Sequence, residues 1–72
     1  MSTLEQRFGS RLKQLRKDRG MTQAQLAEAA DLSDRHIRNL EKGERWPESA
    51  TVKKLCNALN TTIRELFDFD YP

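Results

Sequence analysis

The sequence predicts an all-α fold of five short helices, and three observations support this. Apolar residues recur at helical spacing along the chain, as in Leu4, Phe8, Leu12 and Leu15. Residues that typically cap helix N-termini precede most of these apolar runs. Alternating apolar and polar runs and hairpin dipeptides, which would indicate strands, do not occur in the sequence.

The helices are predicted at 3–19, 22–30, 33–42, 49–59 and 62–67, followed by a tail at 68–72. The pairs Thr3 with Gln6, Thr22 with Gln25 and Thr62 with Glu65 fit capping boxes, and Ser33 and Ser49 suit the caps of the third and fourth helices. Helix ends are expected at residues that adopt the left-handed conformation, namely Gly20, Asp31, Gly43 and Asn60. The expected core is Leu4, Phe8, Leu12, Leu15, Leu26, Ala27, Ala30, Leu32, Ile37, Leu40, Val52, Leu55, Cys56, Leu59, Ile63 and Leu66.

Length and composition limit what the chain can do. Its 72 residues predict one domain over 1–72. A single cysteine, Cys56, and a single histidine, His36, supply neither an internal disulfide nor the ligands of a usual zinc site. We therefore expect no metal, no cofactor and no small-molecule ligand. The sequence shows no nucleophile–base pair, so we expect no enzymatic activity.

No apolar run approaches the length of about 20 residues that a membrane span needs. The N-terminal residues lack the apolar stretch of a signal peptide. We therefore expect a cytoplasmic protein with no membrane partner.

Charge is distributed unevenly along the chain. Residues 5–19 carry six basic side chains against Glu5 and Asp18, which gives a local charge of +4. Residues 49–72 balance to zero. A basic first segment can attract phosphates, but it can equally be the solvated face of a helix.

The second and third predicted helices are joined by about three residues, which is typical of a helix-turn-helix. The second helix of this pair turns only Ile37 and Leu40 inward. Its outward side chains are rich in hydrogen-bonding groups: Ser33, Asp34, Arg35, His36, Arg38, Asn39 and Lys42. Such a helix suits the major groove of DNA, where base edges offer donors and acceptors.

The stretch from Met21 to Gly43, MTQAQLAEAADLSDRHIRNLEKG, resembles the phage-repressor and Cro type of helix-turn-helix. The similarity continues in RLKQLR at 11–16, LCNAL at 55–59 and IRELF at 63–67, and covers residues 7–67. This resemblance implies a five-helix, lambda-repressor-like DNA-binding domain. It also implies a homodimer on a pseudo-palindromic operator of double-stranded DNA, with helix 33–42 in the major groove.

The resemblance also implies roles for individual residues. Gln23 matches a glutamine that bonds a phosphate and braces the recognition helix. Base-reading positions correspond to Ser33, Asp34, Arg35 and Asn39, and Arg38 shares their face; contacts to the DNA backbone correspond to Lys42 and Arg45. Arg16 and Glu41 match a partly buried ion pair. Among these residues, Arg35 is our first choice as a guanine reader.

The sequence departs from the family pattern at several positions. Asp31 stands where the family turn usually holds glycine, although aspartate tolerates the left-handed conformation better than most residues. Asp34 is acidic in a phosphate-rich groove; it can accept from a cytosine amino group or orient Arg35 or Arg38. Glu44 and Glu48 reduce the positive charge of the following loop.

The aromatic residues near the C-terminus leave two questions open. Trp46 can cover the core or lie in a dimer contact. For Phe67, Phe69 and Tyr71 we favour a subunit interface built by the last helix and the tail. The alternative function is an antitoxin-like adaptor in which the acidic, aromatic tail docks onto a protein partner. Restriction–modification controllers, Cro-like repressors and antitoxin partners all share this small format.

Overall fold

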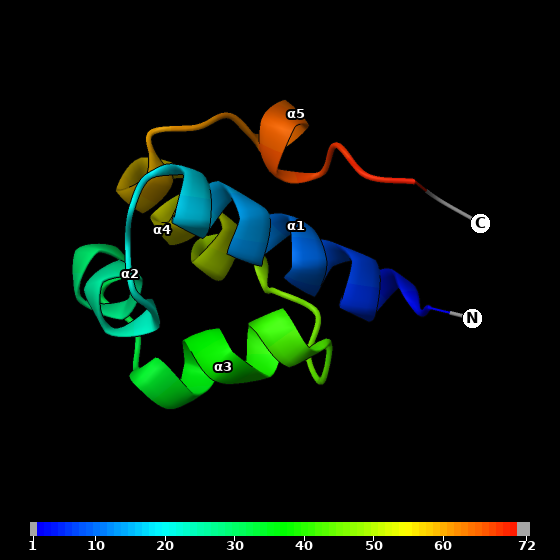
Figure 1. The fold of residues 1–72 in the computed structure, drawn as a ribbon, viewed down its shortest axis with the longest axis horizontal. Helices are drawn as coiled ribbons and strands as arrows, with labels where there is room; N and C mark the ends of the chain where they lie inside the picture. Colours follow the sequence, from blue (N-terminus) through cyan, green and yellow to red (C-terminus); the bar gives the residue numbers. More distant parts are fainter. Residues whose placement is uncertain (1, 71–72) are drawn as a thin grey trace.

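The computed structural model describes residues 2–70 and contains five helices in this range (Figure 1). They are α1 (Leu4–Asp18), α2 (Gln23–Ala30), α3 (Asp34–Lys42), α4 (Ser49–Leu59) and α5 (Ile63–Leu66). The described residues contain no strand, and the predicted all-α fold is confirmed. Each helix begins and ends within one residue of its predicted limits, because the predicted ranges included most of the capping residues.

Local hydrogen bonds explain where most of the helices begin. Thr3 and Thr22 both form complete capping boxes with the glutamine three residues later. Ser33 Oγ accepts from the His36 N–H at 3.0 Å, and Thr62 Oγ1 accepts from the Glu65 N–H at 3.1 Å. These bonds involve residues three apart in sequence, which is why the sequence alone predicted them.

The predicted cap of α4 was wrong. Ser49 is the first residue of the helix, and Glu48 precedes it as the N-cap without a side-chain capping bond. The first hydrogen bond of this helix runs from the Val52 N–H to the Glu48 carbonyl, at 2.9 Å. Pro47 is buried before it, so packing of the preceding loop decides where the helix begins.

Figure 1 shows α3 on one side of α1, and α5 with the C-terminal segment on the other. The core between the helices consists of Phe8, Leu12, Leu15, Leu26, Ala27, Ala30, Ile37, Leu40, Leu55, Cys56, Leu59 and Leu66. Leu32 and Val52 are only partly buried against this core, and Leu4 is half-buried. Burial raises the pKa of the Cys56 thiol, which favours its neutral form.

Ile63 was wrongly predicted to be in the core, because 60% of it is exposed. The helix α5 has a single turn, and Leu66 occupies its buried side. A helix of one turn cannot show the repeating pattern that separates an inward from an outward position. Its first apolar residue was therefore assigned to the wrong side.

The backbones of α1 and α3 approach each other closely at Gly9. A Cβ atom at this position would clash with the Leu40 carbonyl oxygen and would lie 2.6 Å from that of Glu41. Glycine is therefore required at this contact for lack of space. The contact sets the end of α3 directly against the first half of α1.

A buried ion pair joins the same two helices further along. Arg16 Nε donates to Glu41 Oε2 at 2.7 Å, and Arg16 Nη2 donates to Glu41 Oε1 at 3.0 Å. Only 9% and 4% of the two side chains are exposed. Arg16 also donates to the Met21 carbonyl at 2.8 Å, and Gln23 Nε2 donates to Glu41 Oε1 at 3.1 Å. One carboxylate thus ties α1, α2 and α3 together.

Among the described residues, no helix combines the length and the apolar character that crossing a membrane requires.

Removing one partner of the buried pair should destabilise the fold. We expect Arg16→Met or Glu41→Leu alone to lower the free energy of unfolding by about 3–5 kcal/mol, because each leaves a buried charge without its partner. The double variant should lose much less than the sum of the two, since it leaves no charge behind. Urea denaturation followed by circular dichroism measures all three variants, and strictly additive losses would contradict this interpretation.

Candidate nucleic-acid interface

The turn between α2 and α3 fixes the angle between these helices. Asp31 adopts the left-handed conformation with φ 55°, as predicted, and the Leu32 N–H donates to the Ala27 carbonyl at 2.9 Å. Ala27 and Ala30 are buried, and their small side chains let α3 pack closely on α2. The turn and the alanines therefore hold α3 in one orientation on the domain.

The outward face of α3 is polar and carries more positive than negative charge. Ile37 and Leu40 turn into the core and are fully buried. The exposed side chains of this helix are Asp34, Arg35, Arg38 and Lys42, while His36 and Asn39 are half-buried. None of these four exposed side chains has a hydrogen bond or ion pair to another residue of the described chain. Three cations and one carboxylate thus remain available to a ligand.

Ser33 lies at the start of this face and has a structural role there. Its hydroxyl oxygen accepts the His36 N–H as the N-cap of α3, and its own hydroxyl proton remains free to donate. A ligand contact from Ser33 would therefore coexist with the cap.

The N-terminus of α2 offers a second set of donors. The cap from Thr22 satisfies the Gln25 N–H, and the Leu26 N–H bonds to the Thr22 carbonyl at 3.0 Å. The N–H groups of Gln23 and Ala24 are left without a helical acceptor, as expected in a first turn. Together with the helix dipole they favour an anion, such as a phosphate. The Gln23 side chain is half-buried, and its bond to Glu41 braces α3.

The loop that follows α3 contributes Arg45, which is exposed. Gly43 ends the helix in the left-handed conformation, with φ 80°. Glu44 and Glu48 are both exposed in the same loop region, so its charge is mixed. Arg45 is therefore the one basic side chain of this loop that can extend the charged face of α3.

Trp46 packs against the aromatic core while remaining 45% exposed. Its ring centroid lies 5.7 Å from that of Phe8 and 5.8 Å from that of Phe67. The two uses considered for Trp46, a lid on the core and a surface for a partner, are thus compatible. Together, Trp46 and Ile63 are the exposed large apolar residues of the described chain.

The aromatic residues of the C-terminal segment fold back onto the domain. Phe67 and Phe69 pack against the core, and their centroids lie 5.2 Å and 6.5 Å from that of Phe8. Arg7 Nη1 donates to the Asp70 carbonyl at 2.8 Å, which holds this segment along α1. Tyr71, the remaining residue of the predicted interface, lies outside the described residues.

The exposure of Ile63 and the close approach of α3 at Gly9 were not predicted from the sequence. Periodicity could reveal neither, since α5 is too short and glycine carries no side-chain signal. Within residues 2–70, no group of three histidine, cysteine, aspartate or glutamate side chains is arranged to hold a metal ion.

Comparison with known proteins adds to this picture. The helix-turn-helix family matches residues 12–66, from the middle of α1 to the end of α5. The immunity repressor protein of Bacillus phage phi105 is 36% identical over 55 residues, covering 76% of this chain and 38% of that protein. The control protein C.MunI of Mycoplasma sp is 32% identical over 68 residues, covering 93% of this chain and 92% of that protein.

A solved structure resembles the whole domain. The restriction-modification controller protein C.AhdI from Aeromonas hydrophila superposes with a TM-score of 0.83 at 34% identity, covering 86% of this chain and 94% of that one. The capped α2–turn–α3 unit, its exposed basic face and these matches agree, and the chain belongs to the helix-turn-helix family.

Proposed function

We propose that this chain is a sequence-specific DNA-binding transcriptional regulator whose helix α3 enters the major groove. The observation that carries the proposal is the outward face of α3, where Arg35, Arg38 and Lys42 are exposed and have no partner within the described chain. The buried contacts of Glu41 hold this helix from behind. A recognition helix needs this combination of a free outer face and a rigid inner one.

Each side chain of the face has a role that fits its chemistry. Arg35 reads guanine through O6 and N7, and Asn39 pairs with adenine. Arg38 and Asp34 share the reading face, where the carboxylate accepts from cytosine or orients an arginine. Backbone phosphates are contacted by Lys42, Arg45 and the first turn of α2 around Gln23.

The active form is proposed to be a C2 homodimer on a pseudo-palindromic site. Two copies of α3 would enter successive major grooves about 34 Å apart. The exposed apolar residues Trp46 and Ile63 are candidates for the dimer contact. Both neighbour Phe67: the Trp46 ring packs against the Phe67 ring, and Ile63 precedes Phe67 by four residues, one helical turn. In this arrangement Phe67 and Phe69 support the interface from the core side.

The relatives favour a regulatory role for a domain of this size. The match to the control protein C.MunI extends over nearly the whole of both chains, so the two proteins are of similar length. The alternative of an adaptor with a docking tail has less support. The described part of the tail is bound to α1 by Arg7 and packed on the core through Phe69.

Selection from a pool of random duplex DNA at two salt concentrations tests the proposed function. We expect enrichment of an inverted repeat with half-sites about one helical turn apart, because two identical subunits read it. Retention should fall steeply at the higher salt concentration as bound cations return to the phosphates. Absence of any enriched sequence would contradict sequence-specific binding and would favour a protein partner.

Replacing the proposed guanine reader should relax the enriched sequence at one position of each half-site. We expect Arg35→Ala to weaken binding to the enriched duplex by about 1–3 kcal/mol per contact, and to affect a random duplex less. Fluorescence anisotropy with both duplexes measures the difference. An equal loss on both would show that Arg35 contacts phosphate and does not read a base.

Introducing a charge on the exposed face of α5 should weaken the dimer. We expect Ile63→Asp to shift sedimentation toward the monomer, because it places a carboxylate within an apolar contact. The matched control is Asn57→Asp, which adds the same charge at an exposed position of α4. If Ile63→Asp sediments like the control, the dimer does not use this face.

A further inference from the structure

The basic residues of α1 divide into two groups. The four arginines of residues 5–19 all donate to another part of the chain: Arg7 to the Asp70 carbonyl, Arg11 to the Glu65 carbonyl, Arg16 to Glu41, and Arg19 to the Leu59 carbonyl. These bonds join α1 to α3, to the end of α4, to α5 and to the C-terminal segment. The arginines therefore have structural roles, and the local charge of +4 is not all available to a partner.

The two lysines of the same helix behave differently. Lys13 and Lys17 are exposed, and neither has a hydrogen bond or ion pair with any residue of the described chain. They are four residues apart, so both lie on the same side of α1, one turn from each other. Like charges at this spacing repel each other, so the fold gains nothing from the pair.

The contacts of neighbouring residues show which side this is. Lys13 follows Gly9 by one turn, and Gly9 packs against the carbonyls at the end of α3. Lys13 also precedes Arg16 by three residues, and Arg16 binds Glu41 of α3. Positions three and four apart share a helix side, so the lysines emerge along the edge of α1 that borders α3.

The neighbouring surface of α3 carries a cation, Arg38, and a carboxylate, Asp34, one turn apart. Arg38 precedes Glu41 by three residues, so it lies on the side of α3 that faces this edge. Arg38 is exposed and has no partner among the described residues. Free cations therefore flank the buried Arg16–Glu41 pair on both helices.

We propose that Lys13 and Lys17 bind backbone phosphates of DNA, and so extend the interface from α3 onto α1. This inference rests on the proposed function. An ammonium group is a point charge on a flexible stem, which suits a phosphate and carries no base preference. The two lysines thus add affinity that is independent of sequence, beside the face that reads the bases.

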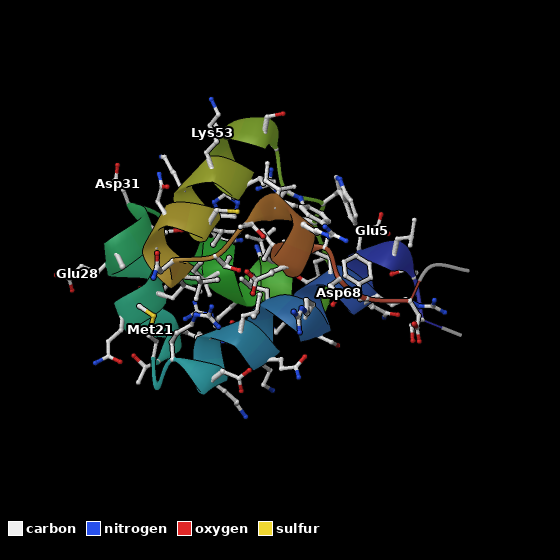
Figure 2. The ribbon with its side chains drawn as sticks, turned by 90° about the horizontal axis from the view of Figure 1, so that it is seen from above. Glu5, Met21, Glu28, Asp31, Lys53 and Asp68 are labelled. Atoms are coloured by element: carbon white, nitrogen blue, oxygen red, sulfur yellow. The ribbon has the colours of Figure 1, made fainter. Side chains whose placement is uncertain are left out.

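The test compares two double variants with the same net charge. Lys13→Gln/Lys17→Gln removes the proposed contacts, and Lys53→Gln/Lys54→Gln removes two charges from α4 as the control. Figure 2 shows Lys53 pointing away from the domain on the side opposite to α1. Lys54 makes only long contacts to Asp31, at 3.4 Å and 3.9 Å. Neither pair is expected to alter folding, and urea denaturation checks this.

Binding is measured by fluorescence anisotropy over a range of salt concentrations, with the enriched duplex and a random-sequence duplex. For a dimer with four such lysines, the slope of log Kd against log salt should fall by about three to four in the Lys13/Lys17 variant. Both duplexes should be weakened by the same factor, so that the ratio of their affinities stays that of the wild type. The control should keep nearly the wild-type slope.

Three results would overturn the inference. The first is a Lys13/Lys17 variant whose slope of log Kd against log salt equals that of the wild type, and the second is a change in this slope no larger than that of the control variant. The third is a loss of affinity confined to the enriched duplex. A wild-type protein that binds neither duplex would overturn the proposed function itself. Failure of the inference alone is recognised by a wild type that binds and selects normally.

Discussion

The contact between α1 and α3 is the constraint on which the other features depend. At Gly9 the two backbones meet with no room for a side chain, and about two turns further along α1 Arg16 binds Glu41 through two hydrogen bonds. The polar pair is directional where the apolar core is not, so it fixes the rotation of α3 about its own axis. That rotation decides which side chains of α3 face outward.

The same contact separates the basic residues of the chain by function. Arginine presents several donors in a planar fork, and the arginines of α1 and its C-cap use this to bind a carbonyl or carboxylate of another helix or of the C-terminal segment. Lysine gains less from such fixed geometry, and Lys13 and Lys17 remain exposed. One short segment thus supplies both the attachments of α1 and part of the charged surface.

An aromatic cluster links the two sides of the domain. Phe8 of α1 contacts Trp46, which follows α3, and also Phe67 and Phe69, which follow α5. The loop that follows α3 and the surface proposed for the dimer therefore share one packing unit. The spacing of the two recognition helices in a dimer would be set through these rings.

The sequence by itself determined the helices, most of their ends and the composition of the exposed face of α3, because caps and apolar periodicity act over three or four residues. It also determined the pairing of Arg16 with Glu41 through the family resemblance. Only the tertiary structure decided that Ile63 is exposed, that Glu48 and not Ser49 precedes α4, and that the arginines of α1 are bound while its lysines are free. These outcomes depend on partners up to 63 residues away in the chain, and no local pattern contains that information.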